Sequence, residues 1–399
     1  MQRLPTLFST GNMPAFLASR RRFLAGLPIA ALAGGLLPSP AQAAGLGFPR
    51  DHGVHTDFDI EWWYLTGYLY PAVAQPSQSP PTGFQITFFR KRIDSTQRLA
   101  QRLAAKHLVF AHAAITMPAS DGRPAAFFHD QRLARWNGQS PPRDDGRSPV
   151  FVSDTHMAVR LGTGATAWRF DTQDIAARGR SAFKASVTTK GFALALDVRP
   201  TQNTVLQGQQ GLSQKGPDPR STSWYTTDPQ LALTGDLTVS DRTTKGMTGV
   251  AWLDHEWSQG FMPPDAVGWD WIGMNFDNGA ALTAFQLRDR AGHAVWTGGS
   301  WRSGPTDTVR SFGPGDLQWS PQGIWKSPTT GISYPLTWRI ETPQGVFTVA
   351  PIAPNQELDS RATTGTIYWE GLSALRDNSG RRVAWGYLEM TGYGDPLTI

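Results

Sequence analysis

The sequence predicts an all-β fold made of antiparallel strands. Three observations support this prediction. The 399 residues include 41 glycines and 30 prolines, which punctuate the chain with turns. Between these turns lie short runs that alternate apolar and polar side chains, and helical periodicity is scarce. Many short antiparallel strands indicate a sandwich or a barrel, and closure into a barrel removes exposed sheet edges.

The first 43 residues predict an export signal rather than part of the fold. Ser19-Arg20-Arg21-Arg22-Phe23-Leu24 has the pattern of a twin-arginine signal, and an apolar run from Phe23 to Leu37 and the small-residue segment Ala41-Gln42-Ala43 follow it. A membrane anchor is the alternative, but the run contains Pro28 and is shorter than the roughly 20 residues that span a bilayer. We therefore expect a mature chain from near Ala44 and a periplasmic or secreted location.

Composition excludes several classes of function. Four of the 37 Lys and Arg residues and none of the 32 Asp and Glu lie in residues 1–43, so removal of this segment lowers the formal net charge from +5 to about +1. No basic block with interleaved aromatic residues remains, and we expect no nucleic-acid partner. The absence of cysteine excludes disulfides, thiolate catalysis and thiolate-bound metal.

The best-supported strands either alternate apolar and polar side chains or are rich in β-branched and aromatic residues. A hairpin turn is expected at Arg288–His293, between strands over 282–288 and 294–296. Turn-rich stretches at 71–82, 138–149 and 207–220 are expected to be loops, the last of them a candidate binding-site loop. We expect two domains, residues 44–235 and 236–399. The expected strands cover residues 61–70, 83–91, 107–116, 192–198, 281–288 and 382–390.

The stretch from Gly249 to Phe276 is the densest in chemically active side chains, with four tryptophans, four carboxylates and a histidine. If its two arms are strands, the period of two places His255 on the same face as Leu253 and Trp257. Asp270 then shares a face with Ile272, Met274 and Phe276. An acid among apolar neighbours has a raised pKa and can hold a proton near neutral pH.

Motifs spread over the chain resemble those of one family. Segments such as Glu61-Trp62-Trp63-Tyr64-Leu65-Thr66-Gly67, Ala251-Trp252-Leu253-Asp254-His255-Glu256-Trp257, Gly268-Trp269-Asp270-Trp271 and Tyr368-Trp369-Glu370-Gly371 are similar, in order, to the secreted lipocalin-like family that contains carotenoid 1,2-hydratases and AttH-type proteins. The resemblance extends from about Phe48 to Tyr393. It implies two lipocalin-like β-barrels and a long apolar ligand, either isoprenoid or lipid. It also implies a possible exporter complex and allows peripheral membrane contact.

The central stretch predicts acid-catalysed addition of water to an isolated double bond. Asp270 is the predicted proton donor, and His255 or Glu256 is predicted to activate the water. The carbocation formed would be stabilised by indole faces, each contributing about 2 kcal/mol when desolvated. The tryptophans predicted to bind ligand are Trp257, Trp269, Trp271 and Trp63, together with Tyr225.

Other interpretations of these residues stay open. Asp254, Glu256 and Asp270 could instead be structural, bound by arginines or backbone N–H groups, and a carboxylate pair of glycosidase type is a further alternative. We favour a hydratase. The alternative is a carrier that binds the ligand without converting it. We expect no cofactor and no metal, because His52, His55 and Asp57 lack ligand spacing. Serine-nucleophile and nucleotide-binding motifs are absent from the sequence.

Overall fold

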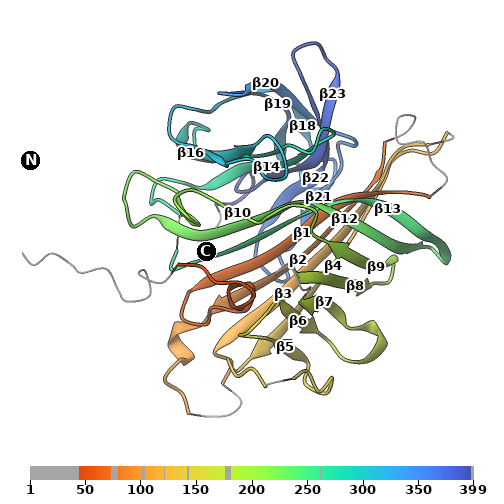
Figure 1. Cartoon of the computed structure of the whole chain (residues 1–399), viewed down its shortest axis with the longest axis vertical. Coiled ribbons are helices and arrows are strands. Elements are labelled where there is room, and N and C mark those ends of the chain that lie inside the picture. The colour runs from red at the N-terminus through yellow and green to blue at the C-terminus, as the bar shows by residue number, and fades with distance from the viewer. Residues whose placement is uncertain are drawn as a thin grey trace, which may run out of the picture. The chain divides into compact units, whose positions relative to one another are not determined.

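The computed structural model describes residues 45–72, 80–100, 104–120, 122–141, 143–175, 181–260 and 262–396 (Figure 1). The predicted export signal lies outside these residues, as does most of the expected loop at 71–82. The regular secondary structure of the described residues is almost entirely strand, as predicted, with three short 3-10 helices, η2 (Arg50–His52), η3 (Asp94–Thr96) and η4 (Gly164–Thr166). None of its helices has the length and apolar character needed to cross a bilayer.

The first sheet is antiparallel and takes the chain from residue 60 to residue 258. Its main path has the order β4-β3-β2-β1-β13-β12-β9-β8-β7-β6-β5, and β10 and β11 pair with β12. Its strands are β1 (Ile60–Tyr70), β2 (Thr82–Arg92), β3 (His107–Met117), β4 (Ala126–Trp136), β5 (Val150–Val152), β6 (Ala158–Leu161), β7 (Trp168–Ile175), β8 (Ser181–Thr188), β9 (Phe192–Arg199), β10 (Val205–Leu206), β11 (Leu212–Gln214), β12 (Thr222–Val239) and β13 (Arg242–Ser258).

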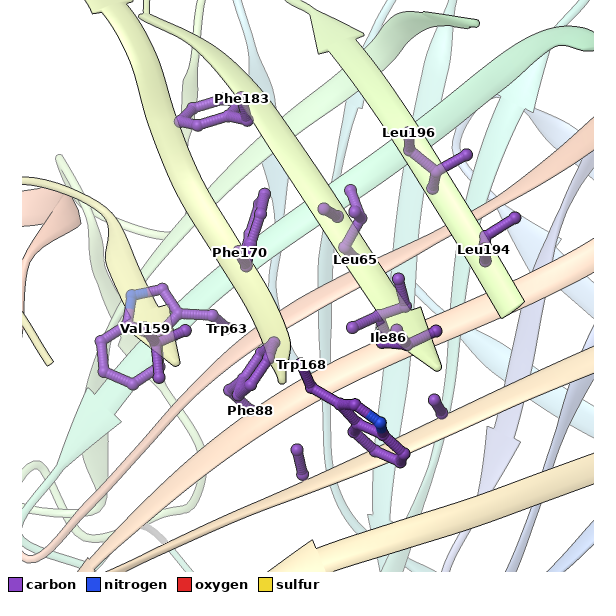
Figure 2. Close-up of a cluster of buried hydrophobic side chains, with 14 of the residues drawn as sticks. Trp63, Leu65, Ile86, Phe88, Val159, Trp168, Phe170, Phe183, Leu194 and Leu196 are labelled. Carbon is purple, nitrogen blue, oxygen red and sulfur yellow. The ribbon is translucent and has the colours of Figure 1, made fainter. Parts of the chain in front are cut away.

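This sheet curls around its own apolar core until its outer strands approach one another. Arg132 on β4 donates a hydrogen bond to the carbonyl of Leu161 at the end of β6, at 3.3 Å, and its guanidinium lies over the Trp168 ring. Figure 2 shows the enclosed cluster, in which side chains from β1 and β2 meet those from β6 to β9. The labelled members are Trp63, Leu65, Ile86, Phe88, Val159, Trp168, Phe170, Phe183, Leu194 and Leu196.

The second sheet is also antiparallel and begins at residue 268. Its order is β17-β16-β15-β14-β23-β22-β20-β19-β18, with β21 paired to β22, and it encloses a separate apolar cluster that includes Ile272, Met274 and Trp369. Its strands are β14 (Gly268–Phe276), β15 (Ala281–Arg288), β16 (Ala294–Arg302), β17 (Arg310–Phe312), β18 (Gln318–Lys326), β19 (Ser333–Thr342), β20 (Gly345–Pro351), β21 (Glu357–Asp359), β22 (Ile367–Arg376) and β23 (Arg382–Met390).

The outer faces of the two sheets pack against each other through a third apolar cluster. Tyr64 and Trp252 from the first sheet contact Trp271, Leu372 and Tyr387 from the second in this cluster. The indole of Trp271 stands edge-on to the Tyr64 ring, with centroids 5.4 Å apart. As a result, the central strands β1, β13, β14 and β23 are buried on both faces rather than on one.

The six expected strands agree with the structure to within one residue at each end, and the hairpin turn at Arg288–His293 is confirmed, although its second strand extends to Arg302 rather than Trp296. The change of sheet falls between Ser258 and Gly268. Residue 235, the expected domain boundary, lies within β12, which pairs continuously with neighbours of its own sheet on both sides of that residue. Residues 45–399 form one compact unit by their contacts, so the two-domain division stays a prediction.

Substitution of Gly249 by alanine tests the tight pairing of β1 with β13. A Cβ at this position would lie 1.8 Å from the Tyr68 carbonyl oxygen, so the backbone of one strand has to move. We expect Gly249→Ala to lower the free energy of unfolding by roughly 1–3 kcal/mol in chemical denaturation. Gly323→Ala is the control, because its Cβ would meet nothing within 4 Å; an equal loss in both variants would contradict the steric explanation.

Candidate functional site

A cavity of about 240 Å³ lies between the two sheets, lined by residues of both. Two rows of paired residues form its opposite walls. In the first sheet the row crosses β2, β1, β13 and β12, and in the second it crosses β15, β14, β23 and β22. The first row is Phe89, Trp62, Glu256 and Tyr225, and the second is Phe285, Trp271, Glu389 and Glu370.

Strand alternation places these side chains toward the cavity. Along β13, Leu253 points into the core of the first sheet, whereas Asp254 and Glu256 line the cavity. Along β14, Ile272 points into the core of the second sheet, whereas Trp269 and Trp271 line the cavity. The indole of Trp271 bridges the walls by donating a 3.0 Å hydrogen bond to the hydroxyl of Tyr225.

Asp254 is held at the cavity wall by three hydrogen-bond donors. The Tyr225 hydroxyl lies 2.7 Å from its Oδ2, and the Thr227 hydroxyl and the Trp252 indole lie 2.6 and 2.9 Å from its Oδ1. Burial raises the pKa of Asp254 to about 7, while hydrogen bonds from Thr227, Tyr225 and Trp252 oppose the rise. The carboxyl group therefore exchanges its proton near neutral pH.

Glu370 and Glu389 form a pair of carboxyl groups on neighbouring strands. They are directly opposite in the β22–β23 register, and both line the cavity. Burial, reinforced by the charge of Glu389, raises the pKa of Glu370 well above its usual value, while hydrogen bonding of the carboxyl group with Tyr64 and Gln85 opposes the rise. Burial raises the pKa of Glu389 to about 8, against a hydrogen bond from Trp269. Among the described residues, Glu370 Oε1 is buried and has no hydrogen-bond partner.

Such a pair holds at least one proton at neutral pH, because burial and mutual repulsion disfavour the ionisation of both adjacent carboxyl groups. Asp254 and Glu256 lie close enough to raise the pKa of Glu389 further. The cavity therefore has a carboxyl pair that retains a proton on the second sheet and further acidic groups on the first.

A buried cation balances one of these acids. Lys215, which follows β11, lines the cavity with its Nζ 3.0 Å from Glu256 Oε1. The Ser223 hydroxyl donates to the same oxygen at 2.5 Å.

His112 and Tyr368 form a hydrogen-bonded chain at another wall of the cavity. Thr363 donates its hydroxyl proton to the Gln131 side chain, so it accepts from His112 Nε2 at 2.8 Å. Burial lowers the pKa of His112 to about 3, so its ring is neutral and Nδ1 accepts from the Tyr368 hydroxyl at 2.7 Å. The Tyr368 oxygen in turn accepts a 3.3 Å hydrogen bond from Gln85 Nε2, so the chain continues from His112 through Tyr368 to Gln85.

The predicted proton donor Asp270 is not among the residues that line the cavity. Its side chain is fully buried and accepts hydrogen bonds from Gln286 at 2.8 Å, Arg288 at 3.1 Å and Tyr393 at 2.9 Å. Burial raises the pKa of Asp270, while the Arg288 charge and these hydrogen bonds lower it. Its placement matches the structural alternative, in which an arginine balances a buried acid.

His255, the predicted water activator, also faces away from the cavity. Its Nε2 lies 3.0 Å from Glu61 Oε1, and its ring stacks on Trp63 with centroids 5.0 Å apart. Burial lowers the pKa of His255 to about 4, against the pull of Glu61, so the ring is neutral. Glu61 also pairs with Arg90 at 3.0 Å and with His55 at 2.8 Å.

This cluster of His55, Glu61 and His255 has a donor set that suits a divalent metal, because the ligand atoms lie within 4.8 Å of one another. The carboxylate of Glu61 is already satisfied by Arg90 and by the His55 backbone N–H, and both imidazoles donate to it. The arrangement is that of a buried structural network that joins β1, β2 and β13.

The predicted ligand-binding residues divide between the cavity and the core. Trp269, Trp271, Tyr225 and the acid Glu256 line the cavity. Trp63 instead packs in the core of the first sheet, where its indole donates to the His52 carbonyl at 3.0 Å. Trp257 is 1% exposed and stacks on His55 with ring centroids 3.8 Å apart.

Sequence reasoning passed over Glu370, Glu389 and Lys215. A signal was present, since each glutamate sits within a strand whose neighbours are apolar. The same reasoning that selected Asp270 applies to both glutamates, and only their placement distinguishes the three acids.

The fold and this cavity define a lipocalin-like all-β protein with a cavity between two curled sheets. The AttH-like family model matches residues 39–393, and the chain belongs to that family. An AttH protein from Nitrosomonas europaea is similar in structure, with 34% identity, a TM-score of 0.74 and coverage of 88% of this chain and 98% of that one. Kievitone hydratase from Nectria haematococca has the same fold, with 13% identity, a TM-score of 0.59 and coverage of 88% and 94%. The comparison with curated proteins finds no match.

Glu61→Gln tests whether the His255 cluster is structural. The substitution leaves Arg90, whose side chain is fully buried, without a balancing charge. We expect the free energy of unfolding to fall by about 3–5 kcal/mol in chemical denaturation. Glu341→Gln, which removes the exposed partner of Arg339, is the matched control and should change it by less than about 1 kcal/mol. Similar small effects in both variants would show that the buried network contributes little.

Glu389→Gln tests the raised pKa of the carboxyl pair. Folding raises the pKa of Glu389 from its ordinary value of 4.5 to about 8, so the favourable contribution of Glu389 to stability is complete below pH 4.5 and is lost as the pH rises through 8. The melting temperature of the variant, measured against wild type by calorimetry, should therefore increase relative to wild type between pH 5 and 8. Asp265→Asn, at an exposed position, should show no such trend. A difference independent of pH would refute the shift.

Proposed function

We propose that this protein adds water across a carbon–carbon double bond of an apolar ligand bound between its two sheets. The observation that carries the proposal is Glu370, a buried carboxyl group with a raised pKa, whose unpartnered Oε1 belongs to a side chain on the cavity wall. A protonated carboxyl group of this kind is what an alkene needs from a general acid.

The Glu370–Glu389 pair performs the proton transfers. Glu370 gives its proton to one alkene carbon, which leaves a carbocation on the other carbon and a carboxylate on the protein. Water then adds to the cationic carbon, and the proton that it loses returns to the pair. The ligand gains one hydrogen and one hydroxyl group, and the pair is regenerated.

Aromatic rings and ionised acids stabilise the cationic intermediate. Trp62, Trp269 and Trp271 line the cavity, and an indole face attracts a desolvated cation by about 2 kcal/mol. Asp254 contributes negative charge once it ionises, and its pKa of about 7 allows this at neutral pH. Tyr368, whose hydroxyl is held between His112 and Gln85, lines the cavity beside the carboxyl pair.

The family relationship supports a hydratase over other classes of enzyme. Kievitone hydratase, by its name a hydratase, shares the fold, and the cavity holds no serine nucleophile that would suggest a hydrolase. At about 240 Å³, the cavity is at the lower limit of small-molecule sites, which measure roughly 300–1,000 Å³. A long isoprenoid would therefore place only its reacting end inside. We retain twin-arginine export to the periplasm or beyond as the proposed route to its ligand.

Glu370→Gln tests the assignment of the acid. The variant keeps the shape of the side chain but removes the proton, so hydration should fall by at least about 100-fold while ligand affinity stays within a few-fold. Geranylacetone and squalene serve as substrates in water enriched in heavy oxygen, and mass spectrometry detects label in a new hydroxyl group. Tryptophan fluorescence gives the affinity.

Asp270→Asn separates this assignment from the one predicted by sequence. Its side chain lies behind the cavity wall, so a folded Asp270→Asn protein should still hydrate the ligand. Loss of hydration in that variant with retention in Glu370→Gln would make Asp270 the acid. Binding by wild type with no labelled product from either substrate would favour a carrier.

A further inference from the structure

We propose that Lys215 is the anchor of an oxygen-binding subsite, and that the ligand of this cavity carries a neutral carbonyl oxygen rather than being a pure hydrocarbon. This inference rests on the proposed function only in assigning the opposite end of the ligand to the carboxyl pair. The binding preference itself does not depend on turnover.

The position of Lys215 is unusual for an amino group. The residue is 4% exposed, yet its side chain lines the cavity rather than reaching the surface. Its Nζ lies 4.5 Å from the centroid of the Tyr225 ring and 4.3 Å from that of Phe285. These two rings belong to opposite sheets, so the ammonium group lies between the two walls.

The hydrogen-bonding capacity of this ammonium group exceeds what its neighbours use. An ammonium group has three N–H donors. Within the described part of the chain, its ion-pair partner is Glu256 Oε1, at 3.0 Å. Its other close neighbours are the two aromatic faces, which attract the charge but do not replace an oxygen acceptor. A ligand oxygen at this end of the cavity would complete the shell.

A hydrocarbon ligand would gain no binding energy from the Lys215–Glu256 ion pair. Burying an ion pair costs several kcal/mol of desolvation, and a purely apolar ligand would seal Lys215 from water without replacing the hydrogen bonds lost. Sites built around a buried polar group discriminate strongly against ligands that lack its partner. An oxygen acceptor on the ligand is therefore favoured.

The charge of the cavity specifies which oxygen group fits. Glu256 already balances Lys215, and Asp254 lines the same cavity. A ligand carboxylate would add a further negative charge beside them, so a neutral carbonyl is preferred. In the second row Phe285, which lies beside Lys215, is at one end and Glu370 is at the other, so the oxygen is assigned to the Lys215 end and the double bond to the carboxyl pair.

Three probes with related carbon skeletons test the subsite by quenching of tryptophan fluorescence. They are geranylacetone, the hydrocarbon in which its carbonyl is replaced by a methylene group, and geranylacetic acid. Wild type should bind the ketone at least about 10-fold more tightly than either of the others. In Lys215→Met the preference over the hydrocarbon should shrink to less than about 3-fold. Equal affinities in wild type, or an unchanged preference in Lys215→Met, would overturn the proposal.

The double variant Lys215→Met/Glu256→Gln guards against a failure to fold, because it removes both charges and leaves no unbalanced carboxylate. It should show the same loss of preference.

The outcomes also separate the two proposals. A ketone preference without hydration supports the subsite and contradicts the hydratase, whereas hydration without a ketone preference does the reverse.

Discussion

The packing of the two sheets through their outer faces is the constraint on which the rest of this structure depends. Curling gives each sheet its own apolar core, and the contact between the sheets then covers the second face of β1, β13, β14 and β23. Side chains that would meet water in an isolated barrel are desolvated here. Because desolvation disfavours the charged form of an acid, the interface between the sheets is where carboxyl groups acquire raised pKa values.

Two pairs of acids within the strands differ in what faces them. Glu61 and Asp270 each have an arginine partner, Arg90 and Arg288, at 3.0 and 3.1 Å. Glu370 and Glu389 face each other, and no arginine balances them within the described residues. The first arrangement stabilises charge and joins strands, whereas the second stores a proton at a cost in stability. This difference, rather than burial alone, separates structural acids from candidate catalytic ones.

The site belongs to neither sheet alone. Its walls are two cross-strand rows, and the hydrogen bond from Trp271 to Tyr225 connects them. Each sheet supplies acids and aromatic rings, while the cation Lys215 comes from the segment after β11. Each curled sheet encloses an apolar core of its own, and the cavity lies between the sheets, so the reaction proposed here requires both.

The sequence by itself determined the fold class, the family and the positions of the main strands, because alternation, turn residues and ordered motifs are local properties of the chain. It also sorted side chains correctly within a strand, placing Asp270 with Ile272 and Met274. It could not decide which face of a strand meets the cavity, because both faces of β13 and β14 are buried. The second sheet covers one of them, and that contact joins residues such as Asp254 and Glu389, which are far apart in the chain. Only the tertiary structure, by setting that contact, decided that Glu370 and Glu389 rather than Asp270 line the cavity.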